Sequence, residues 1–184
     1  MLLVDANNGF NMNLTKQFLE DTAGAKLFFI EEPFHEDGEL YRRLHEWIAQ
    51  KDMKTLIADG EGDYSRHLLE WALQDRVDVL QYDIFNPGFS HWLELAPTLH
   101  GHGIKAAPHH YGNLVGNHVS CHLAAALDGF LFAEWDEAKA DGLDASAWSI
   151  KDGKALVPDR AGFGLDLDEP FYAKRVKEEG FVVS

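Results

Sequence analysis

Cysteine is almost absent from this sequence, since Cys121 is the single one among 184 residues. It cannot form a disulfide within the chain, so we expect a reducing, cytoplasmic environment. The sequence also lacks any apolar run close to the roughly 20 residues that span a membrane. Its N-terminus has no basic start followed by a long apolar region, as a secretory signal peptide would.

Basic residues are scarce as well. The chain carries 16 lysines and arginines against 31 aspartates and glutamates, a formal net charge of −15. Such a surface repels phosphate backbones and anionic lipids, so we set aside nucleic acids and membranes as partners. A hydrophobic content of 46% is ample for a core, and the length fits one domain or a large part of one.

Short apolar runs are present, and each delivers an ionisable residue at its C-terminal end. Leu2–Val4 is the first, and five more follow along the chain. The gaps between the terminal residues are 26, 30, 22, 26 and 25 positions, about the length of one βα unit. The six terminal residues are Asp5, Glu31, Glu61, Asp83, His109 and Glu134.

Parallel strands in one sheet end on the same side, so these six residues should converge on one face. In a βα-barrel that face holds the active site. Clustered carboxylates repel one another unless a cation lies between them. The pattern therefore predicts a pocket with a bound metal.

Amphipathic helices are expected between the strands, for example at residues 13–20 and 39–51, and from Ser65, a good N-cap residue. Beyond Glu134 the sequence becomes polar and irregular, and Asp152-Gly153 predicts a hairpin. We therefore expect a partial βα-barrel over residues 1–135 that carries the site. Residues 136–184 are expected to be a tail that packs on the barrel.

The ordered strand ends resemble the mandelate racemase and muconate lactonizing enzyme branch of the enolase superfamily. The resemblance covers nearly the whole chain and is specific as an ordered set, although each motif alone is weak. It rests on Val4-Asp5-Ala6-Asn7, Ile30-Glu31-Glu32-Pro33, Gly60-Glu61, Gln81-Tyr82-Asp83-Ile84, Ala107-Pro108-His109, Ala133-Glu134-Trp135 and Gly162-Phe163-Gly164.

The resemblance implies that Asp5, Glu31 and Glu61 hold Mg²⁺, an ion that prefers oxygen ligands. A carboxylate substrate would bind this metal and lose its α-proton to give a stabilised enolate. His109 would be the general acid and base, with Asp83 orienting its ring. Glu134 would donate a hydrogen bond to the enolate.

The sequence also departs from the family pattern. It starts at what resembles the third strand of the family's barrel, so the resemblance implies strands three to eight of a TIM barrel. The capping domain, the first two strands and their lysine motif have no counterpart. Six strands cannot close a barrel, so open edges favour a homo-oligomer or association with the missing N-terminal part.

The resemblance favours an acid-sugar dehydratase, a lyase that acts on a small carboxylate substrate. One alternative is a racemase or epimerase, which would need a second base. The other alternative is a non-catalytic truncated fragment. His110 competes with His109 for the role of base. Glu32 and Asp59 compete with their neighbours for the metal, although Glu32 is expected to pair with a nearby charge.

Overall fold

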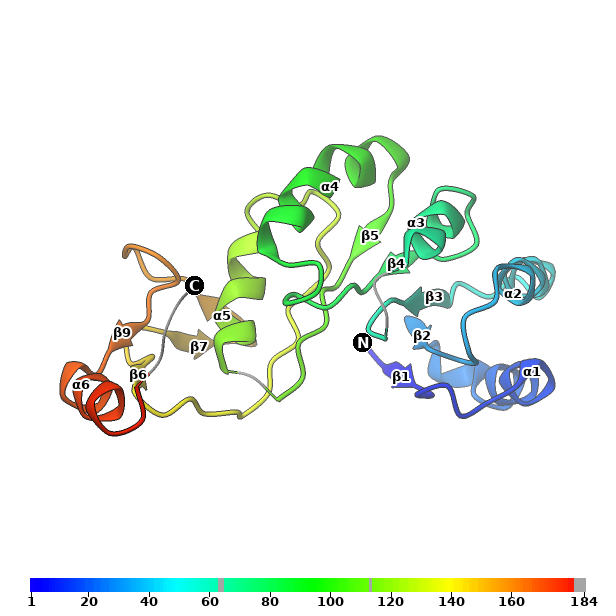
Figure 1. Ribbon diagram of the computed structural model, residues 1–184. Helices are drawn as coiled ribbons and strands as arrows, with labels where there is room; N and C mark the ends of the chain where they lie inside the picture. The colour runs from blue at the N-terminus through cyan, green and yellow to red at the C-terminus, as the bar shows by residue number, and fades with distance from the viewer. Residues whose placement is uncertain (63–64, 113, 181–184) are drawn as a thin grey trace.

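Five short parallel strands form the central sheet of the computed structural model, which describes residues 1–62, 65–112 and 114–180 (Figure 1). They pair in chain order, each with the next. The strands are β1 (Leu3–Asp5), β2 (Phe29–Glu31), β3 (Leu56–Asp59), β4 (Val79–Leu80) and β5 (Lys105–Ala106).

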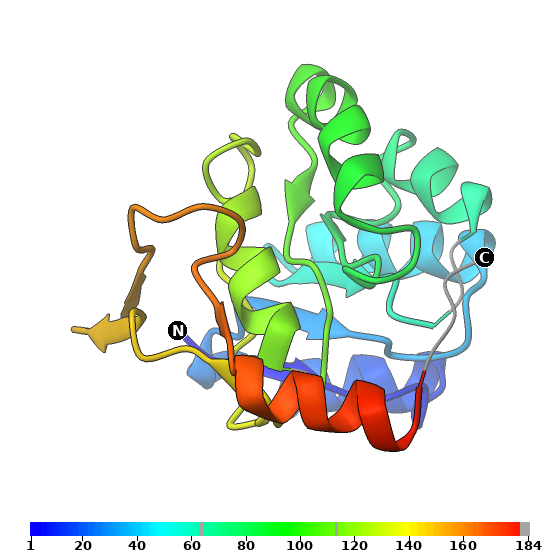
Figure 2. The ribbon, with the colours of Figure 1, turned by 60° about the vertical axis from the view of Figure 1, so that its left-hand side comes forward.

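A helix follows each strand, as the spacing of the apolar residues predicts. The helices are α1 (Met12–Asp21), the short 3₁₀ helix η1 (Ala23–Ala25), α2 (Gly38–Gln50), α3 (Arg66–Ala72), α4 (Phe89–His102) and α5 (Leu114–Leu123). Side chains of Asn11, Asp37 and Ser65 accept hydrogen bonds from the first turns of α1, α2 and α3. Helices α1 to α4 follow one another along one side of the sheet, from α1 at the bottom to α4 at the top of Figure 2.

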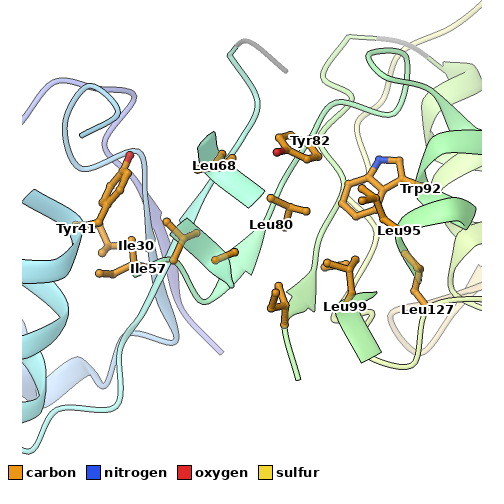
Figure 3. Packing of buried hydrophobic residues seen from close by; sticks show 14 of the residues in the cluster. Ile30, Tyr41, Ile57, Leu68, Leu80, Tyr82, Trp92, Leu95, Leu99 and Leu127 are labelled. Carbon is orange, nitrogen blue, oxygen red and sulfur yellow. The ribbon is translucent and has the colours of Figure 1, made fainter. Parts of the chain in front are cut away.

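Alternate residues of each strand face opposite sides of the sheet. One set packs against the helices beside Tyr41, Leu68 and Trp92 (Figure 3). The other set forms a smaller cluster with Phe28 and Phe132 on the inner side. The helix-facing residues are Ile30, Ile57 and Leu80, and the inner ones are Phe29, Ala58, Val79 and Ala107.

The expectation of a sixth strand at residues 130–133 is wrong for the described chain. This segment joins the sheet through one parallel bridge, between Ala106 and Phe130. Ala106 donates to the Gly129 oxygen at 3.0 Å and accepts from the Leu131 amide at 2.9 Å. The next donor on that side of β5 would be residue 108, which is a proline and has no N–H, so the ladder stops.

The C-terminal segment forms two small antiparallel pairs and a helix. They are β6 (Leu143–Asp144) with β9 (Asp166–Leu167), β7 (Ser149–Lys151) with β8 (Lys154–Leu156), and α6 (Glu169–Glu178). The hairpin prediction is confirmed, because Asp152 and Gly153 join β7 to β8 with φ of 52° and 71°.

Aromatic side chains connect this segment to α5. The Trp148 ring is buried and stacks on His118 at 4.6 Å between centroids. Phe163 contacts both His122 on α5 and Phe89 on α4. Residues 181–184 lie outside the described chain, and the division at residue 135 stays a prediction.

None of the described helices is both long and apolar enough to cross a membrane.

Candidate active site

A cavity of about 410 Å³ opens at the C-terminal ends of the strands. Its wall combines apolar residues of the inner side, such as Phe29 and Phe132, with polar residues from the strand ends. The polar side chains that line it are Asp5, Glu31, Glu61, Gln81, His109, Tyr111 and Glu134. Five of the six predicted site residues therefore face one cavity, and the sixth, Asp83, contacts His109.

The predicted metal ligands come from three neighbouring strands. Asp5 and Glu31 are register partners at the ends of β1 and β2, and Glu61 follows β3. Asp5 also accepts a hydrogen bond from the Asn7 amide at 2.7 Å. No lysine or arginine lines the cavity in the part of the chain that the structure describes.

Glu31 shows the electrostatic consequence of this crowding. Burial raises the pKa of its carboxyl to about 7, a hydrogen bond from Gln81 opposes the rise, and the charges of Asp5 and Glu61 add to it. Burial also raises the pKa of Glu61, and the charge of His109 opposes that rise. A site that disfavours its own negative charges is one that a cation would stabilise.

Gly60 directs Glu61 toward the cavity. Its φ is +138°, and a Cβ there would lie 2.9 Å from the backbone of Gln81 and Tyr82 on the neighbouring segment. Only glycine permits both this conformation and this close approach. The chain therefore turns tightly after β3, where Asp59 faces away from the cavity and Glu61 lines it.

His109 lies between two carboxylates. Its Nδ1 is 2.8 Å from Oδ2 of Asp83, and its Nε2 is 3.3 Å from Oε2 of Glu61. Burial lowers the pKa of His109, but the hydrogen bond with Asp83 and the charge of Glu61 outweigh it, so the net shift is upward. Asp83 is itself fixed by the Phe85 amide, which donates to Oδ1 at 2.7 Å.

His110 occupies a different environment from His109. It is 1% exposed, and its Nε2 lies 2.6 Å from the Glu134 carbonyl oxygen. Its amide N–H donates to Oε2 of Glu134 at 2.8 Å, which fixes that carboxylate at the cavity wall. Of the two histidines, His109 lines the cavity and His110 supports the wall from behind.

The competing acids lie on the other side of the strand ends. Asp59 is fully buried and accepts a hydrogen bond from the Tyr41 hydroxyl. The Glu32 carboxylate accepts a hydrogen bond from the side-chain amide of Asn8 at 2.9 Å rather than pairing with a basic side chain. Among the described residues, the acids whose ligand oxygens all lie within 4.8 Å of one another are Glu32, Glu36 and Asp59. The predicted ligands Asp5, Glu31 and Glu61 share a cavity without meeting that criterion.

Two cavity residues were missed by sequence reasoning. Gln81 is buried and hydrogen-bonds Glu31, while its Oε1 has no partner. Tyr111 is exposed at the cavity rim. A glutamine two positions before Asp83, and so on the same side of the strand, was the available signal for Gln81.

The raised carboxyl pKa values predict that the metal-free chain loses stability as pH rises. Glu31 and Asp59 have pKa values of about 7 and about 8, against ordinary values of 4.5 and 3.8. The folded state therefore holds extra protons, and the stabilisation that they give is lost as pH passes through these folded pKa values. Between pH 5.5 and 8.5 in EDTA, we expect the melting temperature to fall by several degrees. The variant Glu31→Gln should show a smaller fall, and a melting temperature that rises over this range would contradict the assignment.

Comparison with known proteins identifies the family. The family model described as enolase C-terminal domain-like matches residues 1–171. The chain belongs to the enolase superfamily. No curated protein matches it. As a member of the mandelate racemase and muconate lactonizing enzyme branch, it has a mixed α/β fold that corresponds to part of the superfamily's barrel domain.

Solved structures of this superfamily resemble the chain closely. A mutant of galacturonate dehydratase from Geobacillus sp., complexed with Mg, is 46% identical with a TM-score of 0.93. The match covers 97% of this chain and 46% of that one. The same dehydratase complexed with D-galacturonate and 5-keto-4-deoxy-D-galacturonate matches with 46% identity and a TM-score of 0.92, over 96% of this chain and 48% of that one.

A more distant superfamily member is an enolase from an alphaproteobacterium, BAL199, with bound Mg. It is 28% identical with a TM-score of 0.74, over 94% of this chain and 46% of that one. This chain thus spans about half the length of the solved relatives that it matches.

Proposed function

We propose that the cavity removes the proton α to the carboxylate of an acid sugar and then releases the β-hydroxyl, so that the chain acts as a dehydratase, a lyase. The observation that carries this proposal is His109, which lies in one cavity with four strand-end carboxylates and is hydrogen-bonded to a fifth, Asp83. An acid-rich wall with one oriented histidine suits proton transfer beside a bound cation.

Asp83 sets the state of the His109 ring. Because Nδ1 lies 2.8 Å from the Asp83 carboxylate, Nδ1 carries the proton and donates to Oδ2. Nε2 then keeps its lone pair on the cavity side, near Glu61. Nε2 is therefore the atom that takes the α-proton, and the same proton returns to the departing hydroxyl as water forms.

We assign Mg²⁺ to Asp5, Glu31 and Glu61, which offer the oxygen ligands that this ion prefers. When bound, it would supply positive charge that stabilises the negative charge left on the substrate when the α-proton is removed. The raised pKa of Glu31 and the absence of lysine and arginine from the described cavity wall support this assignment.

Glu134 is positioned to contact the substrate. The His110 amide holds its Oε2, which leaves Oε1 available at the cavity wall. In its protonated form, Glu134 would donate a hydrogen bond to an enolate oxygen. Gln81, whose Oε1 has no partner, is a further acceptor for a substrate hydroxyl.

The relatives favour dehydration of an acid sugar. The Geobacillus enzyme is named a galacturonate dehydratase, and its complex holds D-galacturonate and 5-keto-4-deoxy-D-galacturonate. In that product the new keto group lies next to the carboxylate and the next carbon has lost its hydroxyl. This is the pattern that α-proton removal followed by β-hydroxyl loss produces. Racemisation is the alternative, but it needs a second base, and no lysine lines the described cavity.

The division of the chain and its association are also proposals. Residues 1–135 carry all the assigned site residues, and residues 136–184 form the attached tail. The outer edge of β1 has no strand partner among the described residues, and Leu3 at its start and Leu2 before it are exposed. An open apolar edge favours association with a second copy or with a segment equivalent to the rest of the relatives.

Incubation with D-galacturonate and Mg²⁺ in D₂O tests the function. We expect Mg²⁺-dependent appearance of a keto-deoxy acid by NMR, abolished by EDTA. A panel of other acid sugars follows if galacturonate is inert. If Mg²⁺ binds but no acid sugar reacts or exchanges its α-proton, the chain is not a dehydratase by itself, and the non-catalytic reading is favoured.

A further inference from the structure

A second group of carboxylates lies at the ends of β2 and β3, outside the cavity. Glu31 and Glu61 line the cavity, whereas Glu32 and Asp59 do not. Alternation along the chain separates Glu31 from Glu32, and the tight turn at Gly60 separates Asp59 from Glu61. Asp59 reaches Tyr41 of α2, and Glu36 joins the group from the loop before that helix.

The spacing of these oxygens fits one ion. Glu32, Glu36 and Asp59 each offer an oxygen, and these oxygens all lie within 4.8 Å of one another. Two ligands of one Ca²⁺ ion lie at most about 4.8 Å apart, because Ca²⁺–oxygen distances are about 2.4 Å.

Glycine keeps space open beside this group. A Cβ on Gly62 would lie 3.2 Å from Oε1 of Glu36 and 4.0 Å from Oε1 of Glu32. Asn8 donates to the other oxygen of Glu32, Oε2. The Oε1 atoms of both glutamates therefore meet at an open position next to the glycine.

Asp59 supplies an independent observation. It is 0% exposed, and its Oδ2 accepts the Tyr41 hydroxyl, while its Oδ1 accepts no hydrogen bond. A buried carboxylate oxygen without a hydrogen bond costs folding free energy unless a bound ligand contacts it.

The negative charges of these side chains also favour a bound cation. Glu32, Glu36 and Asp59 bring three acidic side chains together, with oxygens within 4.8 Å of one another. These carboxylates repel one another when they are ionised. A divalent cation would satisfy both the charges and the open oxygen.

We propose that Glu32, Glu36 and Asp59 form a second cation site, for a hard divalent ion of the size of Ca²⁺, on the helix-facing side of the strand ends. The ion would join the end of β2, the loop before α2 and the end of β3. Because Glu31 and Gly60 adjoin two of its ligands, the site would hold in place the segments that carry the cavity carboxylates. The inference does not rest on the dehydratase proposal.

Terbium luminescence tests this site, because Tb³⁺ replaces Ca²⁺ and is excited by a nearby tyrosine. Tyr41 contacts the ligand Asp59, and its ring lies 5.9 Å from Trp71. We expect Tb³⁺ emission on excitation of the aromatic residues, displaced by Ca²⁺. Glu36→Gln changes an exposed ligand and should keep the fold, which circular dichroism checks. It should weaken Tb³⁺ binding at least tenfold.

Two control variants separate this site from the cavity. Glu61→Gln, which alters the cavity, should keep the sensitised emission, and so should Glu137→Gln on the exposed tail. If Glu36→Gln binds Tb³⁺ as the unchanged chain does, the proposal is wrong. It is equally wrong if Glu61→Gln alone removes the emission, because the ion would then be in the cavity.

Discussion

The variant His109→Gln is expected to dehydrate acid sugars about 10²–10⁴-fold more slowly than the unchanged chain, the range typical of a lost general base. Glutamine has a similar size but no basic nitrogen, so it cannot take the α-proton at the position of Nε2. It also cannot return a proton to the departing hydroxyl. The rate of keto-deoxy acid formation with saturating substrate and Mg²⁺ measures both losses.

The matched control is His102→Gln, which changes an exposed histidine at the end of α4. Its rate should stay unchanged, and Mg²⁺ binding should persist in both variants. If His109→Gln keeps nearly the full rate, His109 is not the base. A rate that falls only together with Mg²⁺ binding would instead assign His109 a structural role beside Glu61.

Much of the fold could be predicted because its determinants are local. The apolar runs before Asp5, Glu31 and Glu61 specify strands. Asp5 and Glu31 are the last residues of β1 and β2, whereas β3 ends at Asp59, two residues before Glu61. Asn11, Asp37 and Ser65 show in sequence where helices begin. Convergence at one end of the sheet follows from the parallel order, and the turn at Gly60 brings Glu61 into the same cavity.

The remaining features depend on contacts that spacing does not reveal. The prediction of a sixth strand was wrong because Pro108 removes one N–H donor from the hydrogen bonds between β5 and residues 129–131. This effect depends on the strand register. The sequence could not decide fully between His109 and His110, because the difference is the burial of His110 behind Glu134. The docking of Trp148 on His118 joins segments about 30 positions apart and has no local signal.

The variant Glu61→Gln is expected to bind Mg²⁺ much more weakly than the unchanged chain. In Glu61→Gln a charged oxygen ligand becomes a neutral amide, while the size of the side chain is kept. Loss of outer-shell partners of a metal typically costs 10–100-fold in affinity, so loss of a direct ligand should cost at least as much. The same change removes a charge beside Nε2 of His109, which should lower the pKa of that ring.

Isothermal titration of the chain with Mg²⁺, repeated on Glu61→Gln and Glu36→Gln, tests most directly whether the strand-end carboxylates hold the ion. We expect binding in the unchanged chain, a loss of at least 10–100-fold in Glu61→Gln and little change in Glu36→Gln. Equal Mg²⁺ affinity in the unchanged chain and Glu61→Gln, or a loss confined to Glu36→Gln, would place the ion elsewhere and contradict the account.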